Sequence, residues 1–215
     1  MMATKVCGIT NIADAQCALE FGAAAIGFIF YDKSPRAITI KKAKFISDHL
    51  PDKTIKLGVF VDQSMPFILE AVQNVPLNII QLHGDESPEF WEQFQLPVIK
   101  ALHIRNSGSF SIMNDYNVDA FLFDTFSKDK YGGTGETFDW SLFINPTDKP
   151  IILSGGLNSE NVLKAIKLMK PDAIDLNSGL EKSPGIKDHL KIKLFFKNIR
   201  DTVTNFNVFS GLLES

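Results

Sequence analysis

Short β-rich runs alternate with longer stretches of helical periodicity along almost the whole chain. Eight such runs are recognisable, at residues 4–8, 24–30, 55–61, 77–83, 97–103, 119–125, 150–155 and 172–177. This alternation is typical of βα units whose strands pair in parallel. Eight strands and about eight helices in 215 residues predict an α/β fold, a single (βα)8 TIM barrel with eight parallel strands.

A polar capping residue precedes several of the helical stretches. Such residues accept hydrogen bonds from the free backbone N–H groups of a helix's first turn. The alternative architecture, a doubly wound sheet, normally has fewer strands at this length, and no GxGxxG motif follows the first strand. The predicted capping positions are Asn11, Ser64, Ser87 with Pro88, Asn158 and Asp188.

The chain contains no linker, low-complexity tract or charge run that divides it. We therefore expect one catalytic barrel domain over residues 1–203. Residues 204–215 form a tail without an obvious place in the βα pattern. The tail is interpreted as an appendage or a frayed end.

Composition and charge exclude several classes of partner. With a net charge of −3, the chain has no basic stripe that would follow a phosphate backbone, so nucleic acid is not expected. The longest apolar stretch, residues 21–30, is about half of the roughly 20 residues that span a bilayer. The N-terminus lacks the features of a secretory signal. No membrane partner is expected, and the cytoplasm is the expected location.

The two cysteines do not suggest a disulfide framework or a zinc site. Cys7 and Cys17 belong to no CxxC motif and have no histidine pair beside them, so both thiols are expected to be reduced. A cysteine in a buried strand or helix is usually a packing residue, and that is the first interpretation of both.

The carboxyl ends of barrel strands, where active sites of this fold gather, carry unusual polar side chains. Residues two apart on a strand share a face, so apolar Phe121, Phe123, Ile174 and Leu176 are expected to face the helices. A buried lysine needs a partner, and an ion pair of Lys5 with Asp175 or with Asp124 is the simplest interpretation. The side chains predicted to face inward are Lys5, Cys7, Gln81, His83, Asp124 and Asp175.

Glycine-rich turns follow the seventh and eighth strands. Barrels often bind phosphate at these two places through backbone N–H groups. Gly155 with Gly156, and Ser178 with Gly179, are therefore predicted phosphate-binding residues. The YGGTG segment, residues 131–135, lacks the end of a nucleotide P-loop and is interpreted as an active-site loop, with Asp139 capping the next helix.

Three further side chains have two interpretations each. Arg36 follows a stiffening proline in the second βα loop, where its guanidinium suits a carboxylate or phosphate, but it is equally a solvated surface residue. His83 and His103 are structural residues or site residues, and neither lies in metal-ligand spacing.

Taken together, these motifs resemble the phosphoribosylanthranilate isomerase family of tryptophan biosynthesis. The matching pieces run in order from Lys5 to Asp188, and the sequence departs from the pattern in Asn177 and in a longer tail. They are KVCGIT, GFIFYDKSPR, LGVFV, QLHGDE, VIKA, FLFDT, YGGTGETFDW, ILSGGLNSENV, DLNSGLE and PGIKD.

The resemblance implies an Amadori rearrangement by acid–base catalysis without a cofactor or metal. It implies that Cys7 is the general base, Asp124 the general acid and Arg36 a binder of the anthranilate carboxylate. It also implies that the two glycine-rich turns hold the phosphate of a small substrate and that His83 and Asp175 line the site. Lys5 is expected to favour the thiolate of Cys7 by its charge.

Two alternatives to this function remain open. One is a related phosphate-binding barrel, such as an aminoimidazole carboxamide ribonucleotide isomerase, whose first strand would end in an aspartate. The other is a non-catalytic barrel that only binds a phosphorylated ligand, which would need neither the thiol nor the acid. The sequence does not distinguish a monomer from a homodimer.

Overall fold

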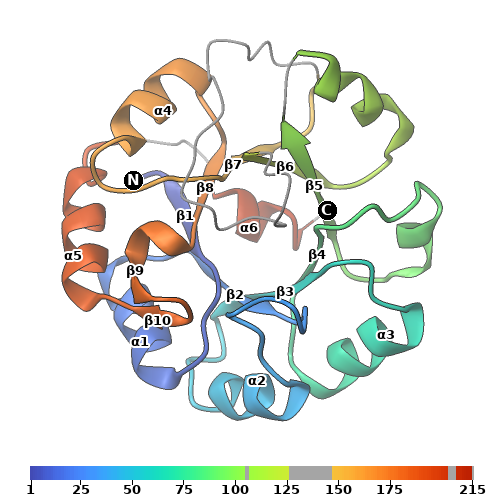
Figure 1. Cartoon of the computed structure of the whole chain (residues 1–215), viewed down its shortest axis with the longest axis horizontal. Helices are drawn as coiled ribbons and strands as arrows, with labels where there is room; N and C mark the ends of the chain where they lie inside the picture. The colour runs from blue at the N-terminus through green and yellow to red at the C-terminus, as the bar shows by residue number, and fades with distance from the viewer. Residues whose placement is uncertain (105–106, 126–146, 203–206, 215) are drawn as a thin grey trace.

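Eight parallel strands form a closed barrel in the order β1 to β8 (Figure 1). The computed structural model describes residues 1–104, 107–125, 147–202 and 207–214. Lys5 on β1 pairs with Ala25 on β2 and with Asp175 on β8, which closes the ring. The predicted TIM barrel is confirmed. The strands are β1 Ala3–Val6, β2 Ala25–Ile29, β3 Ile55–Phe60, β4 Ile79–Leu82, β5 Val98–Ile104, β6 Ala120–Thr125, β7 Ile151–Leu153 and β8 Ala173–Leu176.

Helices surround the barrel on the outside (Figure 1). Asn11 caps α1 by accepting from the backbone N–H of Asp14, and Asp188 caps α5 by accepting from the N–H groups of Leu190 and Lys191, as predicted. The helix α4 begins later than predicted, after Asn161. The outer helices are α1 Ile12–Phe21, α2 Ile40–Ser47, α3 Met65–Asn74, α4 Val162–Met169 and α5 His189–Asn198.

The connections after β4 and β5 contain 3-10 helices, η1 Phe90–Gln93 and η2 Ser107–Asp115. The longer helix predicted after Ser87 is therefore reduced to η1. Pro88 and Pro97 enclose this segment, which leaves room for about two helical turns. The predicted loop 131–135 and the capping residue Asp139 lie outside the described residues.

After β8 the chain forms a small hairpin before α5. The 3-10 helix η4 Ser178–Leu180 leads into β9 Glu181–Ser183, which pairs antiparallel with β10 Ile186–Lys187. This hairpin positions Glu181 and Lys187, both of them buried, next to the second βα loop.

The tail does not fray in its described part. Residues 208–211 form the short helix α6 Val208–Gly211, which lies within the ring of strands in Figure 1. Val208 and Phe209 are fully buried and pack with inward residues near the strand starts, such as Ala3 and Ile79. The interpretation as a frayed end was wrong for residues 208–212, because Val208, Phe209 and Leu212 are buried in the barrel interior. The predicted domain boundary falls among residues 203–206, outside the described part, and stays a prediction.

No helix among the described residues combines the length and the apolar character needed to cross a membrane.

Candidate active site

The inward-facing polar side chains predicted from strand alternation are brought together inside the barrel. The apolar side chains predicted to face the helices, such as Phe121 and Ile174, do so and pack in the outer core between strands and helices. The inward polar set is Lys5, Cys7, Gln81, His83, Asp124 and Asp175, all of them buried.

Cys7 follows β1 and is 4% exposed. It packs with Ile29 and Val59, and its backbone N–H donates to the carbonyl oxygen of Leu176 at 2.8 Å. Burial raises the pKa of the Cys7 thiol and outweighs the lowering by the positive charge of Lys5. Lys5 thus acts in the predicted direction, but the thiol stays protonated at neutral pH.

Lys5 pairs with Asp175, which decides between the two partners that the sequence left open. Its Nζ lies 2.8 Å from Asp175 Oδ2, and the lysine is fully buried. Burial lowers the pKa of Lys5, but Asp175 and Cys7 together outweigh it and hold the pKa above its ordinary value. A fixed positive charge therefore stands beside the thiol.

Asp124 lies on the last inward position of β6 and contacts His83. His83 Nε2 is 3.1 Å from Asp124 Oδ2, and His83 Nδ1 is 2.9 Å from Gln81 Nε2. The ring of His103, on the neighbouring β5, lies 5.3 Å from the His83 ring between centroids. Burial, followed by the proximity of His83, lowers the pKa of His103, so this imidazole is neutral at neutral pH.

Arg36 is buried rather than solvated and is held by a carboxylate that sequence reasoning had not singled out. Its Nε and Nη2 bind Glu181 in a bidentate ion pair, with Nη2 at 2.7 Å from Oε2. Lys187 Nζ lies 3.1 Å from the same carboxylate. Burial alone would raise the pKa of Glu181, but Arg36 and Lys187 together hold it below its ordinary value. The position of Glu181 at the end of the NSGLE motif was the available signal.

The two glycine-rich turns lie against each other. Gly155 and Gly156 have φ values of +86° and +62°, a backbone region that favours glycine. A Cβ on Gly179 would clash with the backbone carbonyl of Leu157, so the turn after β8 approaches the turn after β7 as closely as glycine permits. Ser178 begins η4 beside this contact. Both turns thus present backbone at the carboxyl end of the barrel.

One group of side chains in the described part has donor atoms close enough to consider for a metal ion. Nitrogen or oxygen atoms of His83, His103 and Asp124 all lie within 4.8 Å of one another. His83 Nε2, however, is hydrogen-bonded to Asp124, and a metal would have to displace that bond. The prediction that no metal takes part stays a prediction.

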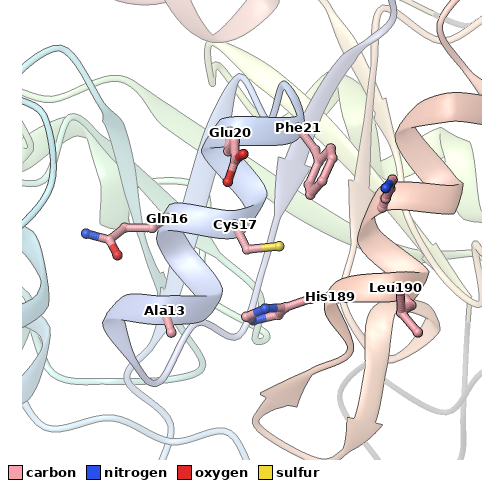
Figure 2. A pocket seen from close by; sticks show the side chains of 8 residues that line it. Ala13, Gln16, Cys17, Glu20, Phe21, His189 and Leu190 are labelled. Carbon is pink, nitrogen blue, oxygen red and sulfur yellow. The ribbon is translucent and has the colours of Figure 1, made fainter.

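A surface groove of about 410 Å³ lies between α1 and α5, on the outside of the barrel (Figure 2). Cys17 points into it from α1, with His189 and Leu190 on the facing helix. Cys17 is 8% exposed and belongs to the outer core, in agreement with its predicted packing role.

The sequence of this chain matches a known protein family. The model of the N-(5'-phosphoribosyl)anthranilate (PRA) isomerase family matches residues 4–198. The isomerase of Legionella pneumophila (strain Corby) is 42% identical over 197 residues, which cover 91% of this chain and 95% of that protein. The isomerase of Pseudomonas fluorescens (strain Pf0-1) is 44% identical over 199 residues, 92% of this chain and 98% of that protein.

Solved structures agree with the sequence comparison. The phosphoribosyl anthranilate isomerase of Thermotoga maritima superposes with a TM-score of 0.87 and 42% identity, covering 93% of this chain and 99% of that chain. A second isomerase structure, in complex with reduced 1-(o-carboxyphenylamino)-1-deoxyribulose 5-phosphate, has a TM-score of 0.84 and 41% identity over the same shares.

Proposed function

The chain belongs to the N-(5'-phosphoribosyl)anthranilate isomerase family, and from this premise we propose that Cys7 is the general base and Asp124 the general acid of its reaction. That reaction is the isomerisation of N-(5'-phosphoribosyl)anthranilate in tryptophan biosynthesis, an Amadori rearrangement. One observation carries the assignment of roles: a thiol and a carboxyl group end β1 and β6 on the inward face of the same barrel mouth.

The acid acts first, on the closed ribose ring of the substrate. Asp124 donates its proton to the ring oxygen, and the bond between that oxygen and C1' breaks. The lone pair of the anthranilate nitrogen forms a C=N double bond with C1', which leaves a cationic imine. A carboxyl group on a strand end, within reach of a ligand in the mouth, suits this step.

The base acts second, on the carbon next to the imine. The cationic imine makes the C2' proton acidic, and the Cys7 thiolate removes it. The electron pair of the broken C–H bond forms a double bond between C1' and C2', and the π pair of the C=N bond returns to the anthranilate nitrogen. The resulting enolamine tautomerises to 1-(2-carboxyphenylamino)-1-deoxyribulose 5-phosphate. In this tautomerisation the Cys7 thiol gives its proton to C1' and Asp124 regains a proton from the C2' hydroxyl, so both groups end in the state in which they began.

Substrate orientation is assigned to charges and backbone groups around this pair. The bonds of Arg36 to Glu181 use Nε and Nη2, so we assign its Nη1 edge to the anthranilate carboxylate. The phosphate is assigned to the two glycine-rich turns, supported by their close packing and by the phosphate-bearing ligand of a related isomerase. His83 and Asp175 complete the lining. The phosphate-binding residues are Gly155, Gly156, Ser178 and Gly179.

Substitution Glu181→Gln is expected to raise KM about 10-fold with a smaller change in kcat. The amide keeps the size of the side chain but loses the charge that holds Arg36, and a hydrogen bond between charged groups contributes about 1.5–3 kcal/mol. Steady-state kinetics measures both constants. The matched control is Glu160→Gln at an exposed position, where neither constant should change. An unchanged KM in Glu181→Gln contradicts the proposed role of Arg36.

Turnover by the purified chain over a range of pH tests the role of Cys7. It is followed as the loss of the substrate's anthranilate fluorescence. Because burial raises the pKa of Cys7, the change of kcat/KM on the alkaline side of its pH profile should lie above about pH 8.5, the ordinary pKa of a thiol. This change is the alkaline limb of the profile. In Cys7→Ser the limb should disappear from this range, because a hydroxyl ionises at much higher pH. A limb that is the same in both proteins overturns Cys7 as the base.

The remaining assignments concern partners and location. We propose a small phosphorylated substrate as the partner, without a cofactor, and the cytoplasm as the location, in keeping with a biosynthetic isomerase. A related isomerase of Thermotoga maritima is described as dimeric, and a homodimer is the corresponding proposal here. Light scattering of the purified chain distinguishes a dimer from a monomer.

A further inference from the structure

A continuous chain of hydrogen bonds crosses the barrel interior from Lys5, the lysine beside the proposed base, to the proposed acid Asp124. Lys5 Nζ donates to Asp175 Oδ2 at 2.8 Å and to Gln81 Oε1 at 2.9 Å. Gln81 Nε2 lies 2.9 Å from His83 Nδ1, and His83 Nε2 lies 3.1 Å from Asp124 Oδ2. All five side chains are buried, so water does not replace these bonds.

The chemistry of the donors sets the direction of every bond in this chain. The ammonium group of Lys5 has only donors, so the Gln81 atom that faces it is the carbonyl oxygen. The amide nitrogen of Gln81, which only donates, must then face His83. His83 Nδ1 therefore accepts a hydrogen bond and carries no proton. A neutral His83 has its proton on Nε2 and donates it to Asp124 Oδ2.

We propose that Gln81, oriented by Lys5, is a positioning residue that locks His83 in the neutral Nε2–H tautomer, an inference that rests on the proposed role of Asp124. A histidine beside a carboxyl group would otherwise compete for its proton, because free imidazole is the stronger base. His83 cannot take a second proton without turning an Nδ1–H group against the amide N–H of Gln81. The lock thus prevents His83 from taking the catalytic proton of Asp124, whose Oδ2 accepts from His83 Nε2.

Charged and titratable groups face His83 from four strands. Lys5 on β1 and Asp175 on β8 neutralise each other in their ion pair. His103 on β5 is neutral, because burial lowers its pKa, and it adds no charge. Asp124 on β6 is the neighbour that favours an imidazolium, and the Gln81 amide opposes that state. Without the amide, an imidazolium at His83 would form a stronger, charge-assisted hydrogen bond to Asp124.

Nitrogen-15 NMR of histidine-labelled protein reads the tautomer directly in the resting enzyme. In the wild type, Nδ1 of His83 should resonate as an unprotonated nitrogen and Nε2 as a protonated one at neutral pH. In Gln81→Glu, which has nearly the same shape, the new carboxylate accepts from Nδ1–H. Both nitrogens should then be protonated.

The kcat of Gln81→Glu and its dependence on pH should change together with the protonation of His83. In Gln81→Glu we expect kcat to fall by about 10²-fold, the lower end of what a general acid contributes, and the acid limb of the kcat profile to move to lower pH. Gln81→Met removes the lock without adding a charge, so its kcat should fall less and its acid limb should move less. The matched control Gln73→Glu, on the exposed side of α3, should change neither the spectrum nor kcat.

The possible results separate the two proposals. A protonated Nδ1 in the wild type overturns the lock, and this measurement needs no variant to fold. Equal losses in Gln81→Glu and Gln81→Met with unmoved pH limbs also overturn it, because a merely structural glutamine predicts that result. Full activity of Asp124→Asn overturns the acid assignment instead, whatever the tautomer of His83.

Discussion

Substitution Asp124→Asn is expected to lower kcat by about 10²–10⁴-fold, the range that one positioned general acid contributes. The amide keeps the size of the side chain and can still accept from His83 Nε2, so the contacts of the buried site are retained. It cannot deliver a proton to the ring oxygen, and ring opening therefore becomes rate-limiting. Substrate carrying deuterium at C2' should then react as fast as ordinary substrate, because the C–H bond breaks after the slow step.

The matched variant Cys7→Ser gives the opposite isotope result. It weakens the base but leaves the acid, so removal of the C2' proton becomes rate-limiting and the deuterated substrate should react several-fold more slowly. Stopped-flow or steady-state fluorescence with both substrates measures the two ratios. If Asp124→Asn shows the large isotope effect and Cys7→Ser shows none, the roles of the two residues are reversed.

Substitution Phe209→Ala is expected to lower the free energy of unfolding by about 3–5 kcal/mol, measured by urea denaturation. Phe209 is fully buried among the inward side chains near the strand starts, and its removal opens a cavity that the closed ring of strands cannot collapse to fill. If the substitution releases α6 from the barrel, the decrease in the free energy of unfolding equals the free energy with which α6 packs against the barrel interior.

Leu213→Ala, one turn further on and 43% exposed, is the control and should change the stability by no more than about 0.5 kcal/mol. Under conditions where the protein is folded, kcat of Phe209→Ala should remain close to that of the wild type, because α6 lies at the end of the barrel away from Cys7 and Asp124. A stability loss below about 1 kcal/mol contradicts the packing role of α6.

Local sequence patterns were sufficient to predict the barrel and the side chains that face its interior. Successive side chains of a strand point to opposite faces, whatever the strand pairs with. This alternation correctly predicted that Asp124 faces inward and Phe121 outward. Capping chemistry acts over three residues, and it correctly predicted the start of α1 at Asn11. By contrast, the helix predicted after Ser87 is only the short 3-10 helix η1, although a capping residue and a proline precede it.

Long-range partners were the part that the sequence could not provide. Glu181 lies 145 positions from Arg36 along the chain, and only the hairpin after β8 brings the two together. The burial of α6 likewise depends on the space left between the first inward residues of eight strands, which no local pattern contains.

By itself the sequence determined the alternating elements, the family and the set of polar side chains that face the barrel interior, because each of these depends on local periodicity or on motifs of a few residues. Only the tertiary structure decided that Lys5 pairs with Asp175, that burial outweighs the lysine's charge at Cys7, and that Gln81 stands between Lys5 and His83. Pairing distances and desolvation arise from strand register and barrel closure, and these exist only when all eight strands are assembled.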